Sequence, residues 1–377
     1  MGARVLWLTK GLGLGGAERL LTLTAAKLTR DRFDVEVAYL LPWKDAFVPE
    51  LERYGVRTHC LGARRTVDPR WVLRLRRLLR DGGYALVHTH SPVPAAAARL
   101  LTRSPARLIH TEHNVWDRYR WPTFAVNALT YPRNDAVIAV SAGVGDSIRR
   151  PRWVPGSFPA VETLLHGVDP DDAPRGPEER AAARASLGLG GSTPVVGTVA
   201  NFTAKKDHAG LLAAIDQVRE EIPDVVLLLI GSGPLEADLR RQVTDRGLQD
   251  TVRFLGSRDD VATLLPGLDV FVLGSRYEGL PISLLEAMAA EVACVVTEVG
   301  GIPEAVTDGI EGRLVPPGDP QLLAAAIRDV LVDPVGRRSM AAAGLTRVQA
   351  DFSIDRAVRR TEELYALTLD AAERDRN

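Results

Sequence analysis

The feature that most limits the fold of this chain is an alternation of short β-branched runs with longer stretches of helical periodicity. In the first half such runs occupy residues 4–9, 35–41, 85–88, 107–110 and 136–140. The segment between the first two runs predicts a helix from about residue 17 to residue 28. Strands that alternate with helices are typical of βαβ units, whose strands are parallel and buried on both faces. We therefore expect a parallel sheet covered by helices.

The alternation stops once and then begins again. Residues 169–177 are rich in proline and aspartate, a composition typical of a linker. Apolar runs return at residues 194–199, 225–230, 252–255, 269–273 and 292–296, and residues 321–367 are mostly helical in pattern. The sequence thus predicts an α/β protein with two Rossmann-like, doubly wound domains that face each other across a cleft. Ligands of such folds bind beyond the carboxyl ends of the strands.

Length and composition agree with two domains. A chain of 377 residues is too long for one ordinary hydrophobic core. No apolar run approaches the roughly 18 residues of a membrane span, and no leader pattern precedes the first strand. Cys60 and Cys294 lie far apart, which argues against a disulfide framework or a thiolate metal site. We expect a cytoplasmic protein.

The formal net charge of −1 hides a strong asymmetry. Residues 1–165 contain 25 Lys and Arg against 14 Asp and Glu, a net charge of +11. Residues 166–377 contain 22 against 34, a net charge of −12. Opposite charges on the two halves favour either docking between them or a difference in what each half binds.

A glycine-rich segment follows the first predicted strand. Gly11-Leu-Gly13-Leu-Gly-Gly16 satisfies the G-x-G-x-x-G pattern of dinucleotide-binding proteins. That interpretation also needs an acidic residue at the end of the second strand, to bind ribose hydroxyls, and this strand ends in Tyr39-Leu-Leu-Pro42. An NAD-binding site is therefore disfavoured. Two interpretations stay open: a tight strand-to-helix turn, or a loop whose N–H groups face a phosphate or a sugar.

Several residues in the second half point to an anionic ligand. Gly231-Ser-Gly233 follows one strand, and Lys205 and Lys206 follow another, where an anion would lie. Glu278 precedes the helix predicted over residues 282–290, and Glu286 lies inside it. The two carboxylates are suited to hold hydroxyls at the two ends of a sugar nucleotide, with its diphosphate near the helix start. Taken alone, they also fit a capping acid and a solvated helical glutamate.

These segments resemble a known family. Glu278 and Glu286, within Ser275-Arg-Tyr-Glu-Gly-Leu-Pro-Ile-Ser-Leu-Leu-Glu286, are similar to the E-x7-E signature of retaining GT-B glycosyltransferases, specifically glycosyltransferase family 4. Further segments that resemble this family are Gly15–Arg19, His166–Asp169, Val199–His208, Phe254–Gly256, Gly300–Glu304 and Gly312–Gly318. The resemblance covers nearly the whole chain.

The resemblance implies a division of labour between the domains. Residues 1–168 would bind the acceptor and residues 169–353 the nucleotide-diphospho-sugar donor, while a helix over residues 354–377 would return to the first domain. It implies catalytic roles for His113, Lys206 and Glu278, and it places His90 on the acceptor side. The implied donor-binding residues are Gly15, Gly16, Asn201, Lys205, Gly231, Gly233, Gly279, Leu280, Pro281 and Glu286. The donor is a substrate, so no cofactor is expected.

No metal is expected either. Asp169-Pro-Asp171 matches the metal-binding D-x-D of another glycosyltransferase fold, but it lies in the predicted linker. The histidines His88, His90 and His113 lack the spacing of a zinc site. Two residues depart from the family pattern. Asn201 stands where the family usually has an arginine, so one contact to the diphosphate is lost or supplied by Lys205, and His166 replaces a common asparagine.

A basic amphipathic helix is predicted over residues 68–80. Arg70, Arg74 and Arg77 share one face of it, opposite a broad apolar side. It is either a surface helix with solvated arginines or a contact with anionic lipid at the inner face of the membrane. The basic half of the chain accordingly suggests an acceptor that is anionic or lipid-linked.

Other functions stay open at this stage. A GT-B sugar-nucleotide epimerase and a noncatalytic sugar-nucleotide binding protein would share most of these residues, and an NAD-dependent oxidoreductase is a more remote alternative.

Overall fold

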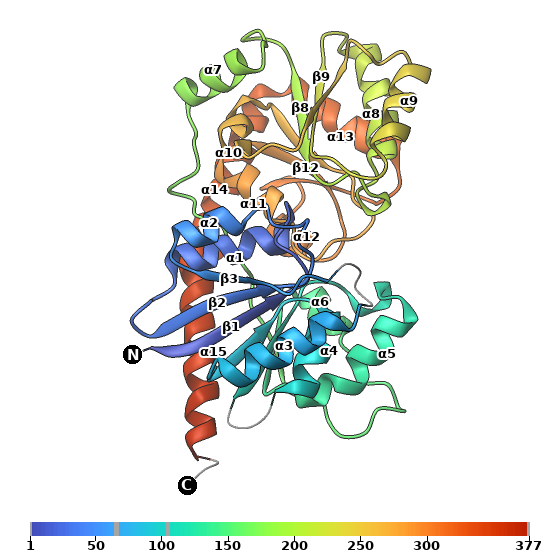
Figure 1. Ribbon diagram of the computed structural model, residues 1–377. Coiled ribbons are helices and arrows are strands. Elements are labelled where there is room, and N and C mark those ends of the chain that lie inside the picture. Colours follow the sequence, from blue (N-terminus) through green and yellow to red (C-terminus); the bar gives the residue numbers. More distant parts are fainter. Residues whose placement is uncertain (1, 64–67, 103–105, 375–377) are drawn as a thin grey trace. The chain divides into compact units, whose positions relative to one another are not determined.

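The computed structural model describes residues 2–63, 68–102 and 106–374, and the chain divides into two compact units (Figure 1). The first unit joins Met1–His166 with Ile354–Asn377, and the second is Gly167–Ser353. Each unit is built on its own parallel sheet, flanked by helices, so the predicted α/β fold with two Rossmann-like domains is confirmed.

The first unit contains a seven-stranded sheet in the order β3-β2-β1-β4-β5-β6-β7. Its strands are β1 (Ala3–Thr9), β2 (Phe33–Tyr39), β3 (Arg57–Cys60), β4 (Leu86–Thr89), β5 (Arg107–Glu112), β6 (Ala136–Ala139) and β7 (Val161–Thr163). Its helices are α1 (Gly16–Lys27), α2 (Val48–Arg53), α3 (Arg70–Asp81), α4 (Pro92–Leu101), α5 (Trp121–Thr130), α6 (Ala142–Ser147) and α15 (Ile354–Arg374), with 3₁₀ turns at η1 (Trp116–Arg118) and η2 (Tyr131–Arg133).

Strand β1 shows why this sheet is covered on both faces. Because successive side chains of a strand point to opposite faces, Val5 and Trp7 pack into one apolar cluster, while Leu6 and Leu8 pack into another. The first cluster includes residues of α1 and of α15, the red helix in Figure 1. The second cluster includes residues of α3 and α4. The last helix of the chain therefore completes the core of the first unit.

The second unit contains a six-stranded sheet in the order β10-β9-β8-β11-β12-β13. Its strands are β8 (Val195–Val199), β9 (Val226–Ile230), β10 (Val252–Gly256), β11 (Val270–Leu273), β12 (Ala293–Thr297) and β13 (Gly312–Val315). Its helices are α7 (Pro177–Ser186), α8 (His208–Glu221), α9 (Glu236–Asp245), α10 (Val261–Leu264), α11 (Ile282–Ala289), α12 (Ile302–Ala305), α13 (Pro320–Val332) and α14 (Pro334–Asp351), with 3₁₀ turns at η3 (Ala204–Lys206) and η4 (Leu265–Gly267).

The ten predicted strands are all present, with ends shifted by no more than two residues. Three further strands in the described part of the chain, β3, β7 and β13, were not predicted, and each is an edge strand of its sheet. The basic helix predicted over residues 68–80 is α3. Cys60 and Cys294 are both free; Cys60 is exposed at the end of β3, and Cys294 is buried.

The two points at which the chain crosses between the units lie side by side. The Val168 amide donates to the Phe352 carbonyl at 2.9 Å, and Val168 forms a parallel bridge with Ser353. A side chain at Gly167 would collide with the Phe352 carbonyl oxygen, so glycine is required for this approach. The crossing at His166–Gly167 precedes the proline- and acid-rich stretch, which belongs to the second unit.

Helix α7, which follows that stretch, is held to the second sheet by a buried carboxylate. Asp269, directly before β11, accepts hydrogen bonds from Arg180 and Arg184 at 2.7 Å each, and Arg337 of α14 lies 3.3 Å away. The side chains of Asp269 and Arg184 are both buried. Because a buried charge is tolerated only when it is paired and hydrogen-bonded, this network ties α7 and α14 to the sheet.

Candidate functional site

In the second unit, the predicted donor residues lie where the strand order reverses. Strands β8 and β11 are neighbours at the centre of the sheet, with β9 and β12 on their outer sides. The loop after β8 contains Asn201, Lys205 and Lys206, and the loop after β11 contains Glu278. In doubly wound sheets this switch point opens a crevice for ligands. The position agrees with the one expected from the sequence.

Backbone hydrogen bonds connect the loops at this edge. The Phe202 amide donates to the Ser232 carbonyl at 3.0 Å, which joins the loops after β8 and β9. The Arg276 amide donates to the Lys205 carbonyl at 2.8 Å, which joins the loops after β8 and β11. Gly231, with φ of +140°, allows the β9 loop to approach, because a side chain there would collide with the Ala200 carbonyl oxygen. The loops thus form one supported surface.

A buried ion pair lies within this surface. The Lys206 ammonium donates to Glu278 Oε1 at 2.5 Å, and the Ser275 hydroxyl donates to the same oxygen at 2.7 Å. The Lys205 ammonium lies 3.8 Å from Glu278 Oε2. Glu278 is only 6% exposed and Ser275 is fully buried. Burial lowers the pKa of Lys206, and the attraction of the Glu278 carboxylate opposes that shift. The structure therefore brings both predicted catalytic residues of this unit together.

The turn that supports Lys206 is strained and anchored. Asp207, the residue that precedes α8, has φ of +46°, an uncommon conformation for a residue other than glycine. Its carboxylate accepts a hydrogen bond from the Gly210 amide at 3.4 Å and one from Arg276 at 3.1 Å. Since strained residues persist only where their surroundings hold them, this turn fixes the direction of Lys205 and Lys206.

The remaining donor residues lie close by or on the adjoining helix. Gly279 accepts a hydrogen bond from the Gly301 amide at 2.5 Å, which joins the loop after β11 to the loop after β12. Leu280 and Pro281 are buried, and Pro281 directly precedes α11, which has no side-chain cap. Glu286 lies one turn beyond the first residue of α11 and is partly buried, and Asn201 is exposed. Gly233 lies in the loop that bonds to Phe202.

In the first unit, the predicted histidines form a row. The rings of His88 and His90 lie 4.2 Å apart, and His90 Nδ1 lies 3.4 Å from His113 Nε2. His90 and His113 are thus brought together at the carboxyl ends of β4 and β5, while His88 lies within β4. Burial lowers the pKa of all three well below the usual value for histidine, so each imidazole is neutral near pH 7.

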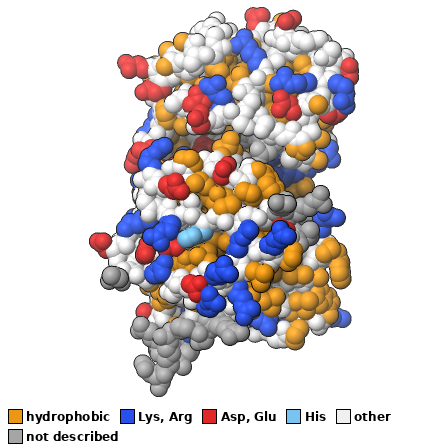
Figure 2. All heavy atoms as spheres, viewed as in Figure 1, with side chains coloured by type: hydrophobic (Ala, Val, Ile, Leu, Met, Phe, Trp, Pro, Cys, Tyr) orange, Lys and Arg blue, Asp and Glu red, His pale blue; other side chains and the backbone are white. Residues whose placement is uncertain are grey.

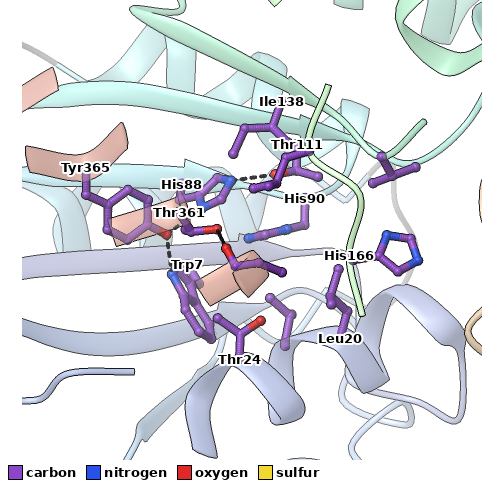
Figure 3. A pocket seen from close by; sticks show the side chains of 14 residues that line it. Trp7, Leu20, Thr24, His88, His90, Thr111, Ile138, His166, Thr361 and Tyr365 are labelled. Carbon is purple, nitrogen blue, oxygen red and sulfur yellow. Dashed lines mark hydrogen bonds between the residues drawn. The ribbon is translucent and has the colours of Figure 1, made fainter. Parts of the chain in front are cut away.

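The row is anchored by residues that the sequence did not single out. Figure 3 shows the Tyr365 hydroxyl of α15 between Trp7 and His88. Trp7 Nε1 donates to Tyr365 at 2.9 Å, and Tyr365 lies 2.6 Å from His88 Nδ1. His88 Nε2 lies 2.7 Å from the Thr111 hydroxyl. Because the tryptophan N–H only donates, the chain is fully satisfied when Tyr365 donates to Nδ1 and His88 carries its proton on Nε2.

A pocket lies beside the hydrogen-bonded side chains of Trp7, Tyr365 and His88. Its lining includes Trp7, His88, His90 and Tyr365, together with residues of α1 and α15. The loop that bears His113 is held by Glu112, which accepts hydrogen bonds from Trp116 and Tyr119. The row of histidines is therefore fixed from two sides.

Backbone hydrogen bonds hold the glycine-rich segment to the loop that follows β2. The Leu12 amide donates to the Lys44 carbonyl at 2.7 Å, and the Phe47 amide donates to the Leu12 carbonyl at 2.9 Å. Gly15 is extended and precedes α1, which begins at Gly16 without a side-chain cap. Amide groups of an uncapped first turn are available to water or to a ligand.

Two kinds of feature are absent from the described part of the chain. No group of three or more His, Cys, Asp or Glu there is arranged to hold a metal ion. No described helix is both long enough and apolar enough to cross a bilayer.

Comparison with known proteins identifies two matching families. The family described as Glycosyltransferase Family 4 matches residues 14–172, and the family described as Glycosyl transferases group 1 matches residues 179–347. Together they cover most of both units.

Two curated relatives of this chain are both named GDP-mannose-dependent mannosyltransferases. A GDP-mannose-dependent monoacylated alpha-(1-6)-phosphatidylinositol monomannoside mannosyltransferase of Corynebacterium glutamicum is 36% identical over 55% of this chain and 56% of its own length. A GDP-mannose-dependent alpha-(1-6)-phosphatidylinositol monomannoside mannosyltransferase of Mycolicibacterium smegmatis is 30% identical over 74% of this chain and 75% of its own. The match to the first relative thus spans little more than half of that protein.

Solved structures share the fold over nearly the whole chain. Anabaena Alr3699/HepE in complex with UDP-glucose has a TM-score of 0.84 at 23% identity and covers 96% of this chain and 99% of its own. A sucrose-phosphate synthase from Thermosynechococcus elongatus has a TM-score of 0.83 at 25% identity and covers 98% and 100%, respectively.

Proposed function

Because this chain belongs to glycosyltransferase family 4 and has the GT-B fold, we propose that it is a retaining, metal-independent enzyme that moves a sugar from a nucleotide-diphospho-sugar to an acceptor hydroxyl. Family membership supports sugar transfer itself. The observation that carries the finer proposal is the buried Lys206–Glu278–Ser275 cluster at the switch point of the second sheet.

Lys206 supplies the positive charge that the reaction needs. When the bond between sugar and diphosphate breaks, negative charge develops on the leaving phosphate. A partly buried ammonium stabilises that charge more strongly than one in water, because the surrounding dielectric is lower. In the structure, Glu278 Oε1 lies 2.5 Å from this ammonium. Because Lys206 supplies this positive charge, the proposed mechanism has no step that needs a divalent metal.

Glu278 and Glu286 have separate tasks in this proposal. Glu278 accepts hydrogen bonds from hydroxyls of the donor sugar, and Ser275 keeps its carboxylate in place. Glu286, eight residues later, holds the ribose. Gly231, Gly233 and the segment Gly279–Pro281 let the diphosphate approach backbone amides, and Lys205 replaces the arginine contact that Asn201 does not make.

The first unit binds the acceptor in this proposal. His113 and His90 are neutral near pH 7, so they offer hydrogen bonds to hydroxyl groups without adding charge. His113 acts next to the reacting sugar, and His90 lies on the acceptor side. Gly15 and Gly16, where the turn has no side-chain cap, contribute backbone amides to donor binding in this proposal. The leaving phosphate helps to remove the proton of the attacking hydroxyl, so no pair of carboxylates is required for retention.

The acceptor is lipid-linked or anionic in this proposal, and the protein works in the cytoplasm at the inner face of the membrane. The two relatives reported above are, by their names, phosphatidylinositol monomannoside mannosyltransferases. Within α3, Arg70 and Arg77 are exposed and suited to contact anionic lipid. Arg74 instead donates to the carbonyls of Leu61 and Gly62 at 2.6 and 3.1 Å, so its main task is to hold α3 to the preceding loop.

A thermal-shift screen followed by product analysis tests this function. GDP-mannose, UDP-glucose, ADP-glucose and dTDP-glucose are added in EDTA, and we expect one base class to raise the melting temperature. Transfer to a lipid extract, followed by proton NMR of the product, should show an anomeric configuration equal to that of the donor. A strict Mg²⁺ requirement or an inverted product would refute the mechanism. Donor consumption without a transferred sugar would indicate an epimerase, and binding without consumption a noncatalytic binder.

A further inference from the structure

Helix α5 of the first unit, and the end of the neighbouring helix α4, bury polar side chains and expose apolar ones. In α4, Arg99 is 2% exposed, whereas the next residue, Leu100, is 61% exposed. In α5, Asn127 and Thr130 are buried, while the exposed residues are apolar. A surface helix of a water-soluble protein normally presents its polar side to solvent. The reversal therefore calls for a partner outside the unit.

The buried polar side chains of α4 and α5 have hydrogen-bond partners inside the unit. Arg99 donates to Asn127 Oδ1 at 2.7 Å and to Asn134 Oδ1 at 2.9 Å, and its guanidinium stacks on the Tyr131 ring. Burial lowers the pKa of Arg99 to about 10, so the group stays charged at pH 7. These contacts fix the rotation of α5, and that rotation turns its apolar residues outward.

The outward residues form a defined surface, here called the α5 apolar face. It consists of Trp121, Val126 and Leu129, which are 74%, 49% and 48% exposed. Trp153, 50% exposed, lies beside it with its ring 6.3 Å from that of Phe124. The ten residues of α5 include no charged side chain. Figure 2 shows hydrophobic side chains gathered over α4 and α5, next to Lys and Arg side chains over α3.

Arginines surround this face in the chain. Exposed arginines between residues 118 and 153 are Arg118, Arg120, Arg133, Arg149, Arg150 and Arg152. The same span contains two acids, Asp135 and Asp146. Asp135 is already paired with Arg107 at 2.9 Å. The segments that flank α5 in the chain thus carry more positive than negative side chains.

We propose that the α5 apolar face inserts into the boundary between headgroups and acyl chains of an anionic phospholipid bilayer. Tryptophan is favoured at that boundary, and arginines around an apolar centre match a negative lipid surface. The same arginines would repel a second copy of this face in a symmetric dimer. Lipid insertion rests on the proposed function for its purpose, access to a lipid-linked acceptor, and it adds an apolar anchor to the electrostatic contact of α3.

Vesicle binding measured without donor or acceptor tests the insertion. We expect the protein to pellet with phosphatidylglycerol vesicles and to remain in solution with phosphatidylcholine vesicles. Val126→Glu should weaken the binding at least tenfold, because it places a charge in the inserted face. Val335→Glu is the matched control, since Val335 is a 68% exposed helical residue in the second unit, and it should bind as the unchanged protein does. Both substitutions are on exposed side chains, and melting temperatures verify the fold.

The depth to which tryptophans enter the bilayer provides a second test of the insertion. Brominated phospholipids quench tryptophans that enter the acyl region, so they should quench the protein's fluorescence, and Trp121→Phe should remove much of that quenching. Absence of binding to anionic vesicles at low salt overturns the insertion, as does equal binding by the Val126→Glu and Val335→Glu proteins. A sedimentation dimer that Val126→Glu dissociates, with no vesicle binding, would assign the face to a second copy instead. Because no donor is present, these outcomes are independent of whether sugar transfer itself is found.

Discussion

The carboxyl edges of the two sheets share an architecture but differ in chemistry. In both sheets the strand order reverses near the centre, between β1 and β4 in one and between β8 and β11 in the other. The edge in the first unit presents histidines that are neutral at pH 7. The edge in the second unit presents a partly buried lysine paired with a buried glutamate. The fold thus provides the place, and the side chains decide what is bound there.

The contrast runs opposite to the overall charge of the halves. Residues 1–165 carry a net +11, yet their site residues are uncharged; residues 166–377 carry a net −12, yet their site contains Lys205 and Lys206. Net charge acts over distances of a Debye length, about 10 Å, whereas a site responds to groups in contact. The net charge of each half therefore determines what its surface attracts, whereas the side chains in the loops after the strands determine what its site binds.

The largest effect should come from removing the charge at the second edge. Lys206→Ala should lower kcat by about 100- to 1,000-fold, because no other group replaces the partly buried ammonium that stabilises the leaving diphosphate. Lys205→Ala should cost less than tenfold, since this side chain is more exposed and lies 3.8 Å from Glu278. Single-turnover transfer rates measure both effects. Equal losses in the two variants would contradict the assignment of Lys206, and melting temperatures separate loss of activity from loss of fold.

The second-largest effect should be a difference in stability between the two units at acidic pH. Histidines with folded pKa values below the unfolded value of about 6.5 bind fewer protons in the folded state, so stability falls as the pH drops below 6.5. His208, the first residue of α8, has its pKa lowered by burial to about 4, which costs the second unit about 2 kcal/mol at pH 5. The described part of the first unit has four such residues, His88, His90, His110 and His113, and this unit should lose more stability.

All six tryptophans lie in the first unit, so urea unfolding followed by tryptophan fluorescence reports that unit, and circular dichroism reports both. Between pH 7 and pH 5 the fluorescence midpoint should fall below the dichroism midpoint. Glu36 does not contribute to this change between pH 7 and pH 5. Burial raises its pKa, but hydrogen bonds from Tyr84, His59 and Arg4 lower it further, to about 2. An unchanged fluorescence midpoint at pH 5 would show that the histidines are not neutralised by folding.

A smaller effect is expected where the last helix supports the first edge. Tyr365→Phe leaves Trp7 Nε1 and His88 Nδ1 without their partner, which should cost about 1–2 kcal/mol of unfolding free energy. If Tyr365 positions the histidine row, kcat and the acceptor KM should change several-fold while the donor KM stays constant. Tyr54→Phe, at an exposed position of the same unit, serves as the control. A change confined to stability would reduce Tyr365 to a packing role.

The smallest effect tests the departure at Asn201. Asn201→Arg restores the residue type usual in the family at an exposed position beside Lys205 and Lys206. We expect the donor KM to fall about threefold, or ~0.7 kcal/mol, because an exposed ion pair contributes little. Steady-state kinetics with varied donor provide the measurement. A donor KM that rises would mean that the asparagine makes a contact of its own with the donor.

The strands that the sequence predicted are those with continuous apolar runs. Strand β9, Val226–Ile230, is buried along its whole length and has no polar residue. Strand β3, Arg57–Cys60, was missed because a strand at the sheet edge packs on fewer neighbours and has no such run. Lys206 and Glu278 were placed at one edge because each follows a predicted strand, although 72 residues separate them.

Other parts of the site had no local signal. His88 and Tyr365 are 277 residues apart, and nothing in the sequence around either one indicates the other. Hydropathy would also place Leu100 inside and Arg99 outside, the reverse of their positions. Both facts depend on which elements pack together, and periodicity within one element does not determine that packing.

The return of α15 to the first unit sets an order on assembly. During synthesis, residues 2–166 leave the ribosome before Ile354, Val358 and Tyr365, which complete one face of their core. The second unit is continuous in the chain, so its folding does not have to wait for α15. The histidine row acquires its anchor only after both sheets have been made. A chain cut short before α15 would thus keep the lysine–glutamate pair and leave a nascent first unit, open on one side, to the chaperones of the cell.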